Sequence, residues 1–356
     1  MLSHLILSQL ALGQYGLAAI KNLYDEMGSA DAALKKLGKA FPEEEARARD
    51  EIAWCHDNHV DIRLISDAEY PDRLRHCCDA PLVLFTRGRA DLNALHAISV
   101  VGTRRCTEYG KDVIGTIVGD LAAACPDILI VSGLAYGIDI HSHRAALANH
   151  LSTIGVVAHG QDTLYPALHR KDANNMCISN GGVITEFFHG TTPLAPYFLQ
   201  RNRIIAGISD ATLVIESASH GGGLVTARLA QDYNREVFAV PGPVTSPASE
   251  GTNNLIRDNK AMLVTSASDI ISAMQWDDVA IAAKTRHAGA IERQMFPDLT
   301  TDEKTITDCL AQHGDMQTNI LAIHTAIPIG RLSAMLLSLE MKGIIRPMSG
   351  NTYHLI

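Results

Sequence analysis

The sequence predicts an α/β protein: a doubly wound, mostly parallel β-sheet with an N-terminal helical domain and a C-terminal winged-helix-like domain. From Ile98 to Met274, apolar strand-like runs alternate with amphipathic helical patterns. Before this region apolar residues recur at helical spacing, and after it three helical patterns lead into a terminal hairpin. The length of 356 residues fits a main domain with smaller appendages.

Residues 1–61 predict a domain of short helices. The apolar residues at helical spacing are Leu5, Leu7, Leu10, Leu17, Ile20, Leu23 and Leu34, with Gly13, Gly16 and Gly28 between them. Such a domain either contacts DNA or another protein, or only packs against the core. The sequence favours neither interpretation.

The predicted core covers residues 62–275 and starts with a connector of short strands and turns. The strand-like runs are Ile98–Val101, Ile128–Ser132, Thr153–Ala158, Gly182–Glu186, Ala211–Glu216, Glu236–Val240 and Met262–Thr265. The helical runs are Tyr109–Ala124, Ile138–Asn149, Arg203–Ile208, Leu224–Tyr233 and Asn253–Asn259. This alternation predicts helices on both faces of the sheet, and ligands then bind beyond the carboxyl ends of the strands.

The C-terminal part predicts a linker and a small domain. Residues 276–297 are polar and alanine-rich, which is typical of a linker. Within residues 298–356, helical patterns cover Glu303–Gln312, Gln317–His324 and Ile329–Lys342, and a hairpin pattern follows. Three helices and a terminal hairpin predict a winged-helix-like domain.

The net charge of −9 argues against a protein whose whole surface attracts DNA. A nucleic-acid site must therefore be a local concentration of arginine and lysine. No apolar run approaches the roughly 18 residues of a membrane span, so we expect none. The seven cysteines show neither CxxC nor zinc-ligand spacing, so we expect free thiols in a cytoplasmic protein without metal or cofactor.

Two glycine turns follow the first two core strands. Gly102 allows a tight turn before a helix whose free N–H groups face a phosphate, and Arg104 adds a bidentate contact. The turn is neither a Walker loop nor GxGxxG, which argues against ATP hydrolysis and dinucleotide binding. Gly133 lies in the second turn. The pair His141 and His143 after it does not share one face of a helix, so it predicts no metal site.

Basic residues beside aromatic ones carry the strongest local signal. Arg201, Asn202 and Arg203 follow Phe198 and are expected to open a helix, where arginines oppose the helix dipole unless an anion is bound. Stacking on an aromatic ring beside arginines is how proteins bind single strands. Arg170 and Lys171 are candidate phosphate ligands or simply a solvated basic pair.

A glycine-rich loop, Gly221-Gly222-Gly223, follows the fifth strand. It resembles an esterase oxyanion loop, but the GxSxG nucleophile elbow is absent. The alternative is a loop at Gly222 and Gly223 that lets a nucleic-acid backbone approach closely. No Ser/His/Asp, Cys/His or paired-carboxylate arrangement stands out, so no catalytic residue is predicted.

Taken in order, these loops resemble the DNA-processing protein A (DprA/Smf) family from about Ile62 to Met274. The matching segments are VGTRRCTEYG, VSGLAYGIDIHSHRAAL, DTLYP, GGVITEF, QRNRIIAGISDATLVIE, GGGLVTARLA, REVFAVPG and GTNNLIRD. The resemblance implies an extended Rossmann-like domain, without enzymatic activity, that binds single-stranded DNA, forms homodimers and loads the recombinase RecA in natural transformation.

The resemblance also implies which residues bind DNA. Carried over to this sequence, the pocket residues are Arg104, Gly133, Phe198, Arg201, Asn202 and Arg203, with Arg170 or Lys171 on phosphate. The chain departs from the family pattern at Gly223, where a serine is usual, at His169, near the place of a common asparagine, and at Gln200. These departures put individual phosphate contacts in doubt.

Two further hypotheses come from other functional classes. A nucleotide hydrolase of the phosphoribohydrolase type would need a glutamate after its PGGxGT loop, and here no glutamate follows the glycines and Arg228 lies in the corresponding helix. In the third hypothesis the winged helix recruits partners. This domain carries few basic residues: Lys304, Arg331, Lys342 and Arg346. Binding to a protein is therefore at least as favoured as binding to duplex DNA.

Overall fold

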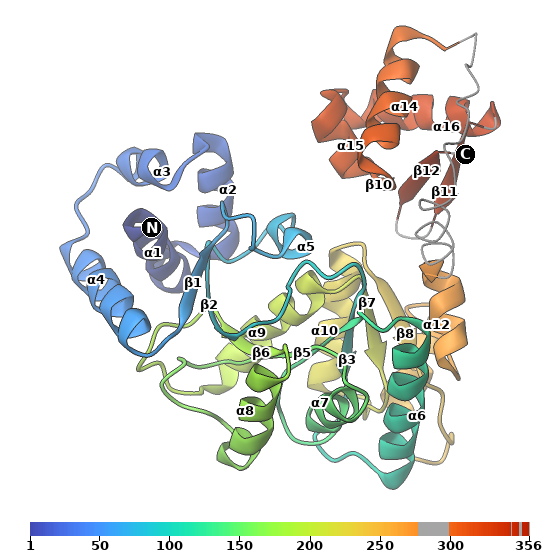
Figure 1. The fold of residues 1–356 in the computed structure, drawn as a ribbon, viewed down its shortest axis with the longest axis horizontal. Helices are drawn as coiled ribbons and strands as arrows, with labels where there is room; N and C mark the ends of the chain where they lie inside the picture. The colour runs from blue at the N-terminus through green and yellow to red at the C-terminus, as the bar shows by residue number, and fades with distance from the viewer. Residues whose placement is uncertain (277–298, 343, 349–350, 356) are drawn as a thin grey trace. The chain divides into compact units, whose positions relative to one another are not determined.

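A computed structural model describes residues 1–276, 299–342, 344–348 and 351–355. These residues form two compact units, Met1–Ser268 and Asp269–Ile356 (Figure 1). Apart from Trp276, the linker predicted over residues 276–297 lies outside the described residues.

A nine-stranded sheet forms the centre of the first unit, in the order β1-β2-β6-β5-β4-β3-β7-β8-β9. The strands are β1 (Asp61–Leu64), β2 (Val83–Gly88), β3 (Ala97–Val101), β4 (Leu129–Ser132), β5 (Thr153–Val156), β6 (Gly182–Thr185), β7 (Ala211–Val214), β8 (Glu236–Ala239) and β9 (Met262–Leu263). From β6 to β9 all neighbours are parallel, whereas β1 and β2 form an antiparallel edge. This confirms the predicted mostly parallel sheet.

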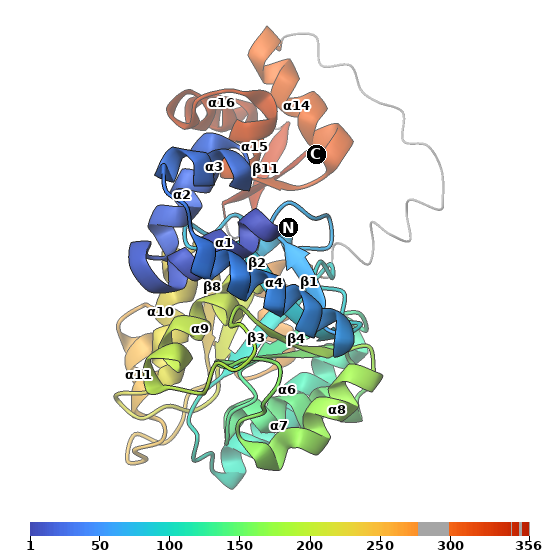
Figure 2. The same cartoon turned by 90° about the vertical axis from the view of Figure 1, so that its left-hand side faces the viewer.

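Helices cover both faces of the sheet, because the parallel strands are apolar throughout. All five residues of β3 are buried, as expected for a strand covered on both sides. Figure 2 shows α9 and α10 on one side and α6, α7 and α8 on the other. The helices of this unit are α5 (Asp72–Arg75), α6 (Glu108–Ala124), α7 (Ile138–Ala148), α8 (Arg170–Ile178), α9 (Ala195–Ile208), α10 (Gly222–Asp232) and α11 (Glu250–Arg257), and α12 (Ala267–Met274) spans the boundary to the second unit.

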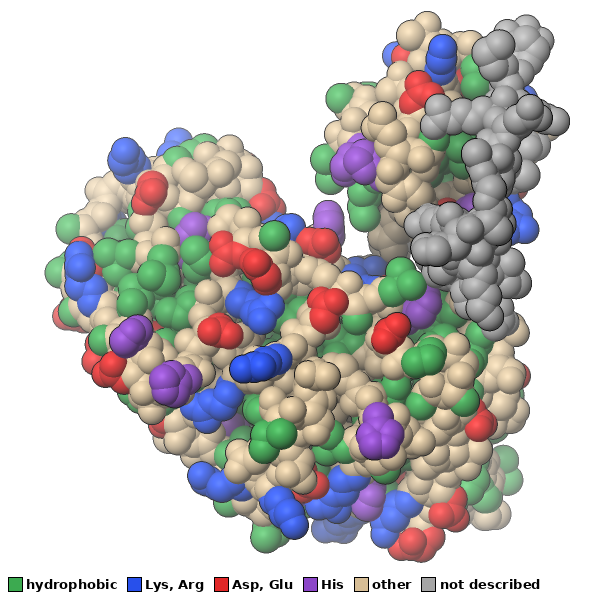
Figure 3. Space-filling model, viewed as in Figure 1, with side chains coloured by type: hydrophobic (Ala, Val, Ile, Leu, Met, Phe, Trp, Pro, Cys, Tyr) green, Lys and Arg blue, Asp and Glu red, His purple; other side chains and the backbone are tan. Residues whose placement is uncertain are grey.

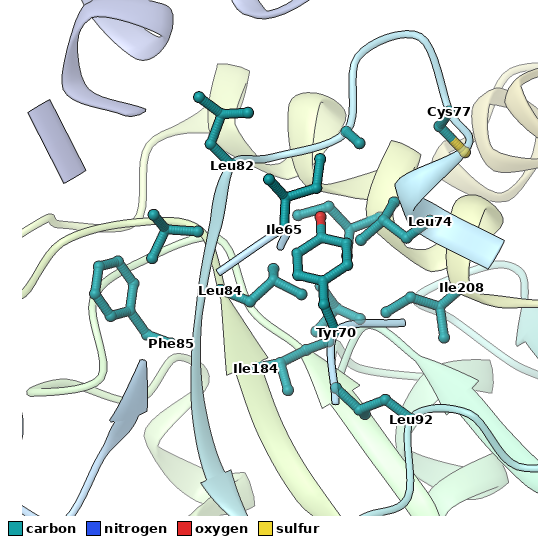
Figure 4. Packing of buried hydrophobic residues seen from close by; sticks show 14 of the residues in the cluster. Ile65, Tyr70, Leu74, Cys77, Leu82, Leu84, Phe85, Leu92, Ile184 and Ile208 are labelled. Atoms are coloured by element: carbon teal, nitrogen blue, oxygen red, sulfur yellow. The ribbon is translucent and has the colours of Figure 1, made fainter. Parts of the chain in front are cut away.

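The N-terminal helices share a core with the sheet edge. They are α1 (Leu2–Leu10), a π-helix (Ala11–Tyr15), α2 (Leu17–Met27), α3 (Ala30–Leu37) and α4 (Pro42–Asp57). Leu5 of α1 belongs to the same buried cluster as Leu84 and Tyr70 (Figure 4). The Tyr70 hydroxyl, fully buried, donates to the Pro81 carbonyl at 2.6 Å, which satisfies the polar end of an otherwise apolar side chain.

The second unit contains the predicted winged-helix-like domain. Its elements are α14 (Thr301–His313), β10 (Met316–Gln317), α15 (Thr318–Thr325), α16 (Ile329–Met341), β11 (Ile345–Met348) and β12 (Thr352–Leu355), with the strands in the order β10-β12-β11. A capping box starts α14: Thr300 accepts from the Glu303 N–H, and Glu303 accepts from the Thr300 N–H. Three helices and a hairpin therefore form as predicted.

No single helix among the described residues is long and apolar enough to cross a membrane. The helices α15 and α16 pass that test only as a pair, bent by 108° at their junction.

Candidate nucleic-acid interface

The principal cleft of the first unit lies where the strand order reverses. From β3 the chain proceeds to β4, β5 and β6 on one side, whereas β7 lies on the other side of β3. Ligand sites of doubly wound sheets occur at such a switch point, beyond the carboxyl ends of the strands. A cleft of about 710 Å³ opens there, lined by the loops after β3, β4 and β7 and by α9 and α10.

Glycines bring the loops of this cleft together. A Cβ on Gly102 would lie 2.6 Å from the Glu216 carbonyl oxygen, and one on Gly223 would lie 3.0 Å from the Gly102 Cα. The turn after β3 and the first residues of α10 therefore touch through their backbones. Gly222 lies in the same first turn of α10 and also lines the cleft.

Arg201 places a buried positive charge at the bottom of the cleft. Its side chain, on α9, is 3% exposed and donates to the Gly133 carbonyl oxygen at 2.8 Å and to that of Val156. Among the described residues, its Nε finds no hydrogen-bond partner. Burial lowers the pKa of Arg201 to about 10, so the guanidinium stays charged at neutral pH.

Phe198 lies beside Arg201 and within reach of a second arginine. The ring centroid is 6.0 Å from Cζ of Arg201 and 5.4 Å from Cζ of Arg104, which is exposed on the loop after β3. Tyr165 meets the same ring edge-on at 5.8 Å. An accessible aromatic ring flanked by guanidiniums is a surface on which a planar base can stack.

Asp139 is the one carboxylate among the residues that line the cleft. Burial raises its pKa, while the charge of Arg201 and the Ala135 N–H, at 3.4 Å, act in the opposite direction. The guanidiniums of Arg104 and Arg201 line the cleft beside this carboxylate. The cleft is thus slightly positive on a chain of net charge −9.

Asn202 joins the two helices that line the cleft. Its side-chain amide donates to the Gly222 carbonyl oxygen at 3.4 Å, and it belongs to the cleft lining. Gly133 does not line the cleft, but a Cβ there would overlap the Arg201 guanidinium and come 2.5 Å from Asp139 Oδ2. Because Gly133 has no side chain, the Arg201 guanidinium can occupy the space beside it.

Arg203 does not reach the cleft. It forms a buried ion pair with Glu186 and donates to the Asp79 carbonyl oxygen at 2.6 Å. Residues two apart lie about 200° apart around a helix, so Arg201 and Arg203 face opposite ways. The expectation that both stand at a helix start is wrong, because α9 begins at Ala195, with a proline in its first turn.

Arg170 and Lys171 also lie outside the cleft lining. Both are exposed in the first turn of α8, a helix that the sequence analysis did not predict. The apolar wall formed by Pro193, Ala195, Leu199 and Ile205 was missed as well. A helix started at Ala195 would have shown it, since Phe198, Arg201 and Ile205 share a face at spacings of three and four.

The other acidic residues at strand ends have structural partners. Glu216 accepts from the Thr107 N–H at 2.9 Å and from its hydroxyl at 2.5 Å, at the start of α6. Asp162 accepts from the Gly190 N–H at 2.8 Å, and Glu186 pairs with Arg203. Each of these three carboxylates thus has a bonding role in the fold.

The HxH pair has a structural role at its second histidine. His143 is buried and bonds to the Thr153 hydroxyl at 2.7 Å, and burial lowers its pKa to about 3. It is therefore neutral at physiological pH. Because its hydrogen-bond partner Thr153 lies on β5, the His143 side chain faces the sheet.

The sequence and the fold of this chain match those of known proteins. Residues 61–275 match the model of DNA recombination-mediator protein A, and residues 294–351 match the DprA winged helix domain. Protein Smf of Escherichia coli is 36% identical over 304 residues, which is 84% of this chain and 78% of Smf. DNA processing protein DprA of Streptococcus pneumoniae is 36% identical over 212 residues, 60% of this chain and 73% of that protein.

Two solved structures share the fold. The X-ray structure of DprA from Streptococcus pneumoniae matches with a TM-score of 0.59 and 31% identity, covering 76% of this chain and 92% of that one. DNA processing protein A from Helicobacter pylori, described for its single-stranded DNA binding mode, matches with a TM-score of 0.55 and 27% identity. The match covers 61% of this chain and 96% of the Helicobacter chain. With two family models matched along its length, this chain belongs to the DNA recombination-mediator protein A (DprA/Smf) family.

Proposed function

We propose that this protein binds single-stranded DNA in the cleft at the switch point of its sheet. The observation that carries the proposal is the Phe198 ring, which lies between the exposed Arg104 and the buried Arg201 at the mouth of a glycine-lined cleft. A stacking surface beside phosphate-binding cations suits unpaired bases of any sequence. The relative from Helicobacter pylori, described for single-stranded DNA binding, supports it.

The charge distribution suits a local site. On the face drawn in Figure 3, lysine and arginine side chains gather mainly along the lower edge of the first unit, with a few acidic and histidine side chains among them. Binding then depends on a few phosphate contacts plus stacking, so the salt dependence is shallow, with a slope of about −0.7 per phosphate neutralised on a single strand. A duplex keeps its bases in the stack and offers none to Phe198.

The proposed role is binding without catalysis. Glu216, Asp162 and Glu186 are bonded to Thr107, Gly190 and Arg203, and Asp139, the carboxylate on the cleft, lies beside the charge of Arg201. The hydrolase hypothesis is tested by incubating the protein with nucleoside monophosphates. Release of free base above a protein-free control would replace the binding role with an enzymatic one.

We extend the proposal to homodimers that protect incoming DNA and load RecA in natural transformation, on the strength of family membership alone. Sedimentation at several concentrations tests dimer formation. RecA filament assembly on single strands coated with single-strand-binding protein, with and without this chain, tests loading. An unchanged assembly rate would contradict the loading role.

For the C-terminal unit we propose a contact with protein. Among the described residues of this unit, Arg331 is engaged with Asp302, and Lys342 with Glu303 at 2.8 Å. Duplex binding needs cations that are free to meet phosphates. Truncation after Met295 should therefore leave DNA affinity unchanged, and a clear loss would assign the unit to DNA.

The central experiment titrates single- and double-stranded oligonucleotides at two salt concentrations with the wild type, Arg104→Ala and Arg105→Ala. Arg105 is the matched control, since it is exposed on the same loop but does not line the cleft. Arg104→Ala should weaken single-strand binding by about 1–3 kcal/mol and reduce the salt slope by about 0.7. Equal binding by both variants would contradict the proposed site.

A further inference from the structure

A group of sulfur and nitrogen donors in the C-terminal unit has no part in the proposed DNA site. Cys309 and His313 lie one turn apart on α14, and His324 lies on the neighbouring α15. One potential ligand atom from each residue lies within 4.8 Å of the other two. The two imidazole ring centroids are also 4.8 Å apart.

The surroundings leave these donors open to a ligand. Both histidines are exposed, and Cys309 is half-buried. The Cys309 thiol donates a weak hydrogen bond to Met316 Sδ at 3.6 Å, and Met316 is 6% exposed. The sulfur therefore has an apolar side, occupied by Met316, and the imidazoles lie at the exposed surface.

We propose that Cys309, His313 and His324 bind a zinc ion, with water in the fourth position. One thiolate and two imidazoles are a donor set that zinc takes in proteins. In a tetrahedral site with Zn–N of about 2.0–2.1 Å and Zn–S of about 2.3 Å, ligand atoms lie about 3.3–3.7 Å apart. The cluster must contract by about 1 Å, which rotation of two exposed imidazoles can supply.

Binding requires the thiolate, so the Cys309 proton is released to solvent as the Zn–S bond forms. The ion would then link α14 to α15, whose contact otherwise depends on buried apolar residues such as Ile306, Leu310 and Leu321. The expected consequence is greater stability of the small unit when zinc exceeds its dissociation constant.

The sequence did not show this site, because the ligands follow no common zinc spacing. They read Cys-x3-His-x10-His, whereas structural zinc sites typically contain CxxC-like pairs. Only the contact between α14 and α15 brings the third ligand to the first two.

The test uses the full-length protein after treatment with a chelator. Cobalt(II) is added as a spectroscopic probe and displaced with zinc. One cobalt per chain should give a thiolate-to-metal charge-transfer band and tetrahedral visible bands, and one equivalent of zinc should abolish both. Cys309→Ser should lose the charge-transfer band, and His324→Gln should weaken zinc binding about tenfold or more.

Cys78→Ser and His56→Gln are the matched controls, since both side chains are exposed and lie outside the cluster. Both should bind zinc as the wild type does. Hydrogen exchange of the α14 and α15 amides checks that each variant is folded, and zinc should slow this exchange in the wild type but not in Cys309→Ser. Absence of the cobalt band in the wild type, or equal zinc affinity in cluster and control variants, would overturn the proposal.

Discussion

Arg201 Nη1 donates a hydrogen bond to the Gly133 carbonyl oxygen at 2.8 Å, and the guanidinium lies against the Cα of that same glycine. The charge at the bottom of the cleft is therefore held by the backbone at the end of β4. Because a buried guanidinium keeps its position only while its acceptors remain in place, residue 133 controls the site without lining it.

Gly133→Ala should displace Arg201 and weaken single-strand binding about tenfold. The new methyl group overlaps the guanidinium, and such overpacking also costs about 1–3 kcal/mol of unfolding free energy. Urea unfolding and a binding titration measure the two effects. Gly115→Ala is the control, since a Cβ there meets nothing within 4 Å on the exposed side of α6. Wild-type affinity in folded Gly133→Ala would show that Arg201 has no role in binding.

Phe198→Ala should weaken single-strand binding by about 1–3 kcal/mol and leave the salt slope unchanged, because stacking is lost while the phosphate contacts stay. Phe198→Tyr keeps the ring and should bind nearly as the wild type does. Fluorescence anisotropy at several salt concentrations separates the two contributions. A changed slope in Phe198→Ala would mean that the ring acts by holding Arg104 in place.

Arg203→Met should destabilise the first unit by about 3–5 kcal/mol, since it leaves Glu186 buried without its partner. Burial already raises the pKa of Glu186, and the Arg203 charge opposes that shift. Adding Glu186→Gln should recover most of the stability. DNA affinity of the folded double variant should match the wild type, and a loss would return Arg203 to the binding site.

The strands of the core could be predicted because the parallel strands from β6 to β7 in the sheet order are covered on both faces and consist mostly of apolar residues, whereas both residues of the edge strand β9 are exposed. The run at Ala211–Val214 illustrates this, as all four of its residues are buried. The helix α8 could not be predicted: its sequence RKDANNMCI is mostly polar and buries only Ala173 and Met176.

Arg104, Arg201 and Arg203 were expected to converge on one groove, and the structure places Arg104 and Arg201 on the cleft but not Arg203. Arg104 follows β3 and Phe198 lies on α9, and they meet only because β7 pairs with β3 on the side away from β4. Strand order is a tertiary property that periodicity does not reveal. The mistaken helix start at Arg203 had a local cause, since Pro196 was not read as the beginning of α9.

Acid should weaken the C-terminal unit through Glu303. Hydrogen bonds from the Lys342 ammonium at 2.8 Å and the Thr300 N–H at 2.9 Å lower the pKa of Glu303 from 4.5 to about 2. Since the folded-state pKa is the lower one, the stabilisation is fully present above pH 4.5. It is lost as the pH falls from there through about 2, because the unfolded chain takes up the proton first.

We expect the loss over this pH range to be about 1–2 kcal/mol, the size of one charge-assisted hydrogen-bond cluster in which Glu303 is buried and Lys342 is partly exposed. Protection factors of the α14 amides between pH 2 and 7 measure it. Glu303→Gln removes the titrating group, so its protection should be lower at neutral pH and should change less with acid. Glu340→Gln, on α16 of the same unit, should keep the wild-type profile. If Glu303→Gln also kept that profile, the acid sensitivity of the unit would have to come from other carboxylates, and the capping box that starts α14 would contribute little to its stability.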